Sequence, residues 1–243
     1  RQEAQGAVAD RLGTTLSVYD AHISSIDQQG GDLSQNLLTA IGTREGAGLN
    51  EAIEAAFSQV RSALNGDEGG VPLFGGGHEE PPFAPRDLDE LVSMAPDEVF
   101  TNGSARPSAR VGDRLDMEYG VLAEDLGSGM MKAFRTLAAA GPFGEKITEE
   151  QAKALGQARE QLESALVGVR GLNANNGRRQ AQAETLSTRA DERALVLKDV
   201  IGRNEDADLG EVAMDLAQQR TVLQASYSVF SQLNSLTLLD FLR

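Results

Sequence analysis

The sequence of 243 residues lacks cysteine and tryptophan and contains only two histidines, His22 and His78. The absence of cysteine excludes a disulfide framework, thiolate metal ligands and a cysteine nucleophile. Two histidines leave little scope for a zinc site or for imidazole catalysis. Eight phenylalanines and three tyrosines are few for a compact enzyme core, because aromatic side chains supply much of the buried area in such cores. We therefore predict no catalytic residues, no metal site and no cofactor.

Basic residues are also scarce. Lysine and arginine together number 22 against 37 acidic residues, which gives a formal net charge of −15. Such a chain repels phosphates, so nucleic acid is not an expected partner. The longest uncharged run, 221–239, is too rich in serine, threonine, glutamine and asparagine to span a membrane. The sequence begins with Arg1 in a helical pattern and shows no apolar signal segment, so we expect it to be a fragment without a cleaved signal peptide.

Apolar residues in the first 66 positions recur at steps of three and four, which is typical of amphipathic and coiled-coil helices. The first stripe predicts a helix over 2–29 and comprises Val8, Leu12, Leu16, Tyr19, Ile23 and Ile26. The pair Gly30-Gly31 suggests that a second, shorter helix follows. A third helix is expected from Leu49 to Leu64, and Asn65-Gly66 is a good stop signal.

Glycine and proline dominate the next region. Six glycines lie between Gly66 and Gly77, and all seven prolines lie between Pro72 and Pro142. This density predicts turns, loops and short strands over 67–125. Alternating residues around Gly112-Asp113 indicate a β-hairpin. A short helix is expected around 130–137, with Ser128 near its N-cap.

Helical patterning returns at residue 148. Thr148 and Gln151 form a capping box, in which each side chain can bond to the other residue's backbone N–H group. No proline interrupts the following stretch up to residue 202, although 173–189 is polar and should be exposed or rely on neighbours outside the chain. A break is expected at 204–208. The last apolar stripe, called the terminal stripe below, comprises Leu209, Val212, Leu216, Leu223, Tyr227, Phe230, Leu233, Leu236, Leu239 and Phe241.

These patterns predict a mainly α protein with a β-rich insertion. The expected architecture is an elongated antiparallel helical bundle that carries a small α+β outer domain. The predicted segments are a first rod arm (1–66), the outer domain (67–147), a second rod arm (148–204) and a terminal assembly helix (205–243).

Three short motifs could suggest chemistry but lack essential parts. His78-Glu79-Glu80 has Pro82 where a zinc protease helix needs its second histidine. Gly75-Gly76-Gly77 lacks the lysine and spacing of a phosphate-binding loop. Gly127-Ser128-Gly129 is not the Gly-x-Ser-x-Gly of a nucleophile elbow. The acidic stretch 79–98 is better explained as a solvated surface.

The C-terminal region resembles that of bacterial flagellins and their hook-associated relatives. The resemblance rests on Asn204-Glu205-Asp206-Ala207-Asp208-Leu209, on Leu223-Gln224-Ala225-Ser226-Tyr227 and on the ending Leu236-Thr237-Leu238-Leu239-Asp240-Phe241-Leu242. Within that superfamily, Pro72-Leu73-Phe74-Gly75-Gly76-Gly77 and Pro81-Pro82-Phe83 resemble the hook–filament junction protein, hook-associated protein three.

This resemblance implies a flagellin-like rod and a structural subunit that joins hook to filament outside the cell. The implied partners are further copies in a ring or tube, another hook-associated protein, flagellin and an export chaperone that covers the terminal stripe. The family's innermost N-terminal helix does not appear in this sequence. We therefore expect 205–243 to be marginally stable as a lone helix and the chain to be monomeric.

Alternatives remain at this point. One is filament flagellin, which belongs to the same superfamily. Another is a helical adaptor or binding module, which would show amphipathic stripes without polymerising. An enzyme within 67–147 is disfavoured, because this region contains a single histidine and no linked set of acid, base and nucleophile.

Overall fold

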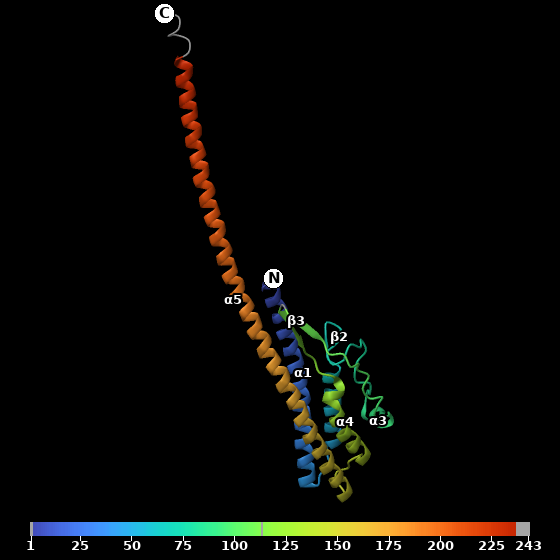
Figure 1. The fold of residues 1–243 in the computed structure, drawn as a ribbon. Coiled ribbons are helices and arrows are strands. Elements are labelled where there is room, and N and C mark those ends of the chain that lie inside the picture. Colours follow the sequence, from blue (N-terminus) through green and yellow to red (C-terminus); the bar gives the residue numbers. More distant parts are fainter. Residues whose placement is uncertain (1, 113, 237–243) are drawn as a thin grey trace, which may run out of the picture. The chain divides into compact units, whose positions relative to one another are not determined.

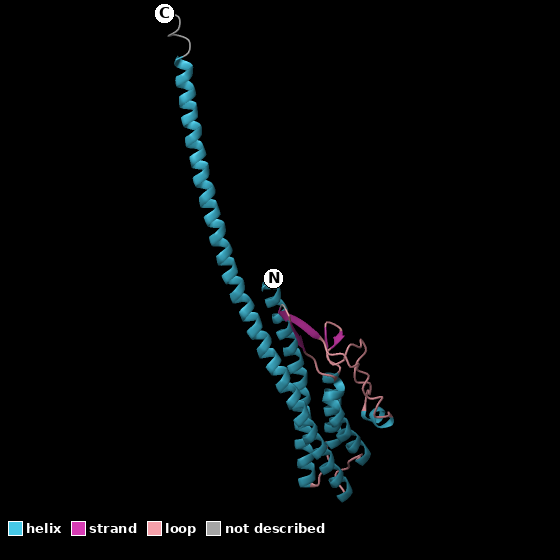
Figure 2. Cartoon of the chain, viewed as in Figure 1, coloured by secondary structure: helices cyan, strands magenta, loops and turns pink. Residues whose placement is uncertain are grey.

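The computed structural model describes residues 2–112 and 114–236, together with their side chains except those of 205–208, 235 and 236. Helices make up most of this described chain (Figure 2). The chain divides into two compact units, one that ends at Ala190 and another that begins at Asp191. The mainly α fold with a small α+β part therefore agrees with the prediction from the sequence.

Helix α1 (Gln2–Thr43) is one continuous helix, so the predicted separate helix after Gly30-Gly31 is wrong. Its buried face repeats by steps of three and four: Ala9, Leu12, Leu16, Tyr19, Ile23, Ile26, Gly30, Leu33, Leu37 and Ala40. Gly30 belongs to this face because a Cβ atom there would lie 2.7 Å from Leu166 Cδ2 and 2.9 Å from Met130 Cε. The glycine thus allows close packing against two other helices instead of ending α1.

Helix α2 (Leu49–Leu64) follows α1 after a short turn and matches the predicted third helix. Asparagine holds a phenylalanine backbone at each end of α2. Near its start, Asn50 Nδ2 donates to the Phe143 carbonyl at 2.9 Å, and Phe143 N donates back to Asn50 Oδ1 at 3.0 Å. Asn65, the C-cap, exchanges the same two bonds with Phe83. These bonds tie both ends of α2 to loops that lie far away in the sequence.

The region after α2 is mostly loop. Strands β1 (Asp67–Glu68) and β2 (Val71–Pro72) form one antiparallel pair. Strands β3 (Ser108–Gly112) and β4 (Leu115–Glu118) form another, in which Ser108 pairs with Glu118. This second pair is the predicted hairpin, of which Asp113 lies outside the described residues.

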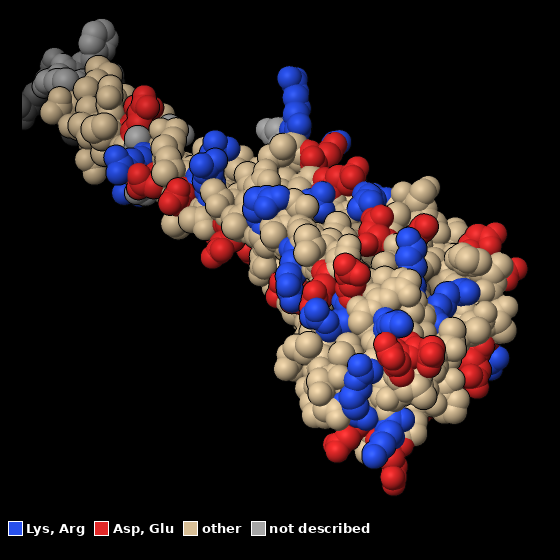
Figure 3. Space-filling view, turned by 90° about the horizontal axis from the view of Figure 1, so that it is seen from below, with Lys and Arg blue, Asp and Glu red and all other residues tan. Residues whose placement is uncertain are grey.

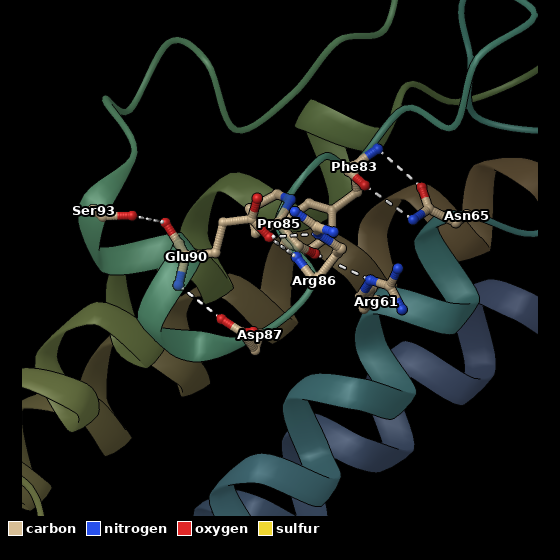
Figure 4. Close-up of polar contacts among 8 residues, drawn as sticks. All are labelled: Arg61, Asn65, Phe83, Pro85, Arg86, Asp87, Glu90 and Ser93. Carbon is tan, nitrogen blue, oxygen red and sulfur yellow. Dashed lines mark hydrogen bonds and ion pairs between the residues drawn. The ribbon is translucent and has the colours of Figure 1, made fainter.

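Helix α3 (Leu88–Ser93) was not predicted, although its start has a recognisable signal. Asp87 is the N-cap and accepts a hydrogen bond from Glu90 N at 2.8 Å. In turn, Glu90 Oε2 accepts one from Arg86 N at 2.7 Å (Figure 4). The spacing of an aspartate three residues before a glutamate is that of a capping box, which explains the local fold.

Helix α4 (Ala123–Ala140) begins earlier than expected, so the placement of Ser128 near an N-cap is wrong. Acidic residues Glu124 and Asp125 occupy the first turn, where the helix dipole favours negative charge. Gly129 faces α5, since a Cβ atom there would lie 2.8 Å from Ala165 Cβ. Ser128 is exposed on the same helix.

Helix α5 (Glu149–Leu236) begins at the predicted capping box. Thr148 N donates to Gln151 Oε1 and Gln151 N donates to Thr148 Oγ1, both at 3.2 Å. The predicted break at 204–208 is wrong, because the backbone remains helical there. Aspartate and asparagine weaken a helix only slightly, and no proline is present to end it. The polar stretch 173–189 is also helical, and it finds its partner inside the chain, in α1.

The main apolar core lies between α1, α2, α4 and the first part of α5, which run side by side (Figure 1). Phe57 and Phe134 meet edge to face within it, with ring centroids 5.3 Å apart. A smaller cluster joins the N-terminal part of α1 to Val111 and Met117 of the β3–β4 pair. Tyr19 belongs to the main core. Its buried hydroxyl donates to the Leu73 carbonyl, and burial raises the pKa of this hydroxyl. Tyr19 thereby anchors the β1–β2 region to α1.

Candidate assembly surface

The predicted contact residues of the terminal stripe that fall within the described chain lie in the second unit, on α5. Seven of them have described side chains: Leu209, Val212, Leu216, Leu223, Tyr227, Phe230 and Leu233. Each of these seven is between 51 % and 73 % exposed. Leu236 lies in α5 but its side chain is outside the description, and Leu239 and Phe241 are outside the described residues. The described part of the stripe is therefore an exposed apolar surface of the helix.

Further apolar side chains extend this surface. Met214, Val222 and Val229 are 56–70 % exposed and were not among the predicted contacts. Val222 and Val229 each lie one position before a stripe residue. This helical spacing is the sequence signal that could have identified them as part of the same surface. A second exposed group comprises Leu195, Val196, Leu197, Val200 and Ile201. Large apolar residues thus recur along most of the described unit.

Two side-chain hydroxyls within the stripe region are hydrogen-bonded to the backbone of their own helix. Thr221 Oγ1 donates to the Ala217 carbonyl at 3.0 Å, and Ser226 Oγ donates to the Val222 carbonyl at 2.8 Å. A hydroxyl bonded to the preceding turn of its own helix can be covered by a partner at little cost. With no charged residue between positions 221 and 239, this part of α5 is suited to an apolar interface.

The first unit presents a different surface. Its exposed large apolar residues are distributed singly over several elements: Val8, Leu38, Val71, Val92, Leu115 and Val167. Figure 3 shows acidic and basic side chains interspersed over one face of it. Such a mixed surface is ordinary for a soluble unit. The contrast singles out α5 beyond Ala190 as the candidate assembly surface.

The other motifs that the sequence singled out occupy structural positions. His78 Nδ1 lies 2.7 Å from the Thr101 carbonyl oxygen, which joins two loops. Gly76 and Gly77 have φ values of 60° and 91°, and Gly76 packs directly against the Gly103 backbone. Such a turn requires glycine for steric reasons. Among the described residues no group of acidic and histidine side chains could hold a metal ion, and none of the helices searched could cross a membrane.

The arrangement defines a class of fold: a helical bundle with a small α+β part and a long C-terminal helix. The sequence matches no family model and no curated protein. Solved structures do share the fold. Bacillus cereus FlgL is 18 % identical, with a TM-score of 0.66 over 81 % of this chain and 93 % of that chain. A putative flagellar hook-associated protein from Vibrio parahaemolyticus is 19 % identical, with a TM-score of 0.68 over 82 % and 90 %.

The structural neighbours of this chain are thus flagellar proteins of the hook-associated type. The resemblance that the sequence indicated is confirmed at the level of the fold.

Proposed function

We propose that the chain is a structural subunit of the bacterial flagellum that joins hook to filament. The observation that carries the proposal is the fold shared with Bacillus cereus FlgL and with a flagellar hook-associated protein. The exposed terminal stripe supports it, because a subunit that assembles must keep apolar surface available for its neighbours. The similarity of 72–83 to the hook–filament junction protein favours this role over that of filament flagellin.

The mechanism we propose is mechanical. The terminal stripe packs lengthwise against helices of neighbouring subunits, while the first unit keeps its charged surface in water. Complete burial of one leucine or phenylalanine side chain contributes about 1.5–3 kcal/mol, so several stripe residues together provide a substantial driving force. Partners on this proposal are further copies of the chain, another hook-associated protein and flagellin. An export chaperone covers the stripe before assembly outside the cell, and export needs no cleaved signal peptide.

Deletion of the encoding gene tests the junction role directly. We expect cells that secrete loose flagellin but carry no attached filament, and a plasmid copy of the gene should restore filaments. Normal filaments and motility in the deletion strain would contradict the proposal. The number of copies per flagellum separates the two flagellar roles. Enough copies for a single ring support a junction protein, whereas thousands of copies identify a filament subunit.

Paired substitutions in α5 test the assembly surface. Leu223→Asp with Phe230→Asp places two charges on the stripe, and both side chains are exposed, so the first unit should fold unchanged. Thr221→Asp with Ser228→Asp is the matched control, since these exposed residues have the same spacing and lie near the opposite side of the helix. Only the control pair should restore filaments. Equal restoration by both pairs would show that the stripe is not the contact.

A further inference from the structure

Helix α5 packs against α1 through two sections of different chemistry. We call residues 155–169 the base section. Its seam residues, which belong to the main core shared with α1, are Leu162, Leu166 and Val169, and they are large, apolar and at most 3 % exposed. The same steps of four and three residues continue toward the C-terminus of α5, into what we call the polar section, 173–190. Its seam residues are Asn173, Asn176, Gln180, Ala183, Ser187 and Ala190. The facing part of α1 remains apolar, so the polar section offers it a poorly matched surface.

Hydrogen bonds in the polar section are few and incomplete. Gln180 Nε2 donates to Ser17 Oγ at 2.7 Å, and Asn173 Nδ2 donates to Ser24 Oγ at 3.2 Å. Asn176, only 1 % exposed, donates to the Leu16 carbonyl at 2.8 Å. The Asn173 Oδ1 atom is buried without a partner in the described chain. Burial of amides that are only partly bonded costs free energy that apolar residues in the base section do not lose.

The helix itself is weak where the two sections meet. Residues 171–177 read Gly-Leu-Asn-Ala-Asn-Asn-Gly, which combines two glycines with three asparagines. Glycine costs about 1 kcal/mol relative to alanine in a helix, and asparagine is also unfavourable. Space around Gly171 and Gly177 is open, because a Cβ atom at either position would meet nothing within 4 Å. Close packing therefore does not explain these glycines.

Opposite the polar section, the apolar face of α1 also contacts the β3–β4 pair. Leu12 and Leu16 cluster with Val111 and Met117 of the β3–β4 pair, and α5 contributes the buried Ala183 and the half-buried Leu186 to this cluster. The hairpin lies along the N-terminal part of α1 (Figure 1). The apolar face of α1 here is thus shared between α5 and the β3–β4 pair, so part of its burial does not depend on α5.

We propose that the polar section of α5 opens from α1 as a unit, with 171–177 as its hinge. The base section and the contact between α1 and the β3–β4 pair remain folded during this opening. Local opening of this kind is expected where apolar burial is small and helix propensity is low. The device gives the chain a joint inside its first unit, immediately before the segment that bears the terminal stripe.

Hydrogen exchange followed by mass spectrometry on the full chain tests the proposal. Amides in 173–190 should exchange at least about tenfold faster than those in 155–169, which corresponds to about 1.4 kcal/mol less protection. Amides in 9–26 of α1 should remain as protected as those of the base section. Equal protection of the two α5 sections overturns the proposal. Joint rapid exchange of 9–26 and 173–190 overturns it as well.

Two neighbouring asparagines supply a matched pair of variants. Asn176→Leu replaces a buried amide by an apolar side chain, while the Leu16 carbonyl keeps its helical hydrogen bond within α1, so exchange in 173–190 should slow about tenfold. Asn175→Leu makes the same change at an exposed site and should alter it less than about twofold. Faster or unchanged exchange in Asn176→Leu contradicts the proposed cause. If Asn176→Leu fails to fold, the double variant Gly171→Ala with Gly177→Ala tests the hinge instead. Alanine strengthens the helix at both positions, so exchange in 173–190 should slow, and unchanged exchange counts against the hinge. These measurements need no assembly, so their failure leaves the junction proposal intact.

Discussion

Asn65 and Phe83 exchange two hydrogen bonds across a loop of the chain. Asn65 Nδ2 donates to the Phe83 carbonyl at 3.0 Å, and Phe83 N donates to Asn65 Oδ1 at 2.9 Å (Figure 4). Arg61, one turn earlier on α2, donates from Nε to the Pro85 carbonyl at 3.0 Å. The loop after α2 is therefore held by its backbone, and the Phe83 side chain can remain buried against Phe57.

Replacement of Asn65 by alanine should release this loop. Both backbone groups of Phe83 lose their partner, and an unsatisfied buried polar group costs about 1–3 kcal/mol. We expect the free energy of unfolding to fall by about that amount in urea titration. Gln59→Ala, at an exposed position of α2, is the control and should change it by less than about 0.5 kcal/mol. A neutral Asn65→Ala would contradict the role assigned to the two bonds.

Two glycines in different surroundings should respond oppositely to alanine. Gly129 of α4 has Ala165 Cβ 2.8 Å from the position of its missing Cβ atom, so Gly129→Ala must push α4 and α5 apart. Overpacking typically costs about 1–3 kcal/mol, which exceeds the gain in helix propensity. Gly168 has open space, and Gly168→Ala should raise the melting temperature through a gain of about 0.5–1 kcal/mol. Thermal unfolding of the two variants checks the sign of each effect.

Glu90 should titrate below the ordinary glutamate range. Its pKa is lowered first by the hydrogen bond from the Arg86 backbone N–H group and then by the Arg86 side chain. Because the backbone bond is the larger cause, Arg86→Ala should leave the pKa of Glu90 below that of a free glutamate in carboxyl NMR titration. Complete return to the ordinary value would show that the guanidinium is the main cause.

The sign of the resulting pH dependence follows from linkage. A carboxyl group whose pKa is lower in the folded chain stabilises the fold above its unfolded-state pKa. That contribution disappears as the pH falls through the folded-state pKa. Glu90→Gln should therefore lower the local stability of α3 near neutral pH and lessen its further loss on acidification, which NMR of the α3 signals across the pH range would check.

Tyr19→Phe should destabilise the first unit by about 1–2 kcal/mol. The change removes the hydroxyl that donates to the Leu73 carbonyl and leaves this buried acceptor without that bond. Tyr227→Phe is the control, because the Tyr227 side chain is 73 % exposed in the second unit. Denaturant unfolding of both variants makes the comparison, and equal effects would contradict a structural role for the Tyr19 hydroxyl.

The sequence alone predicted the helical elements that carry their own signals. The capping box at Thr148 and Gln151, the stop at Asn65 and the heptad-like stripe of α1 all act through neighbours a few residues away. Local rules therefore predicted them. The terminal stripe was also visible in the sequence, since helical spacing of apolar residues does not depend on the rest of the fold.

Tertiary packing decided what local patterns could not. Gly30 resembles a helix end in the sequence, but its missing side chain makes room for Leu166 and Met130, which are distant in the sequence. The polar stretch 173–189 was expected to be exposed or to need partners outside the chain, yet Ser17 and Ser24 of α1 bond to it. Long-range contacts thus decide the role of each glycine and asparagine. Glycine suits both turns and close helix contacts, and asparagine suits both exposed positions and buried hydrogen bonds.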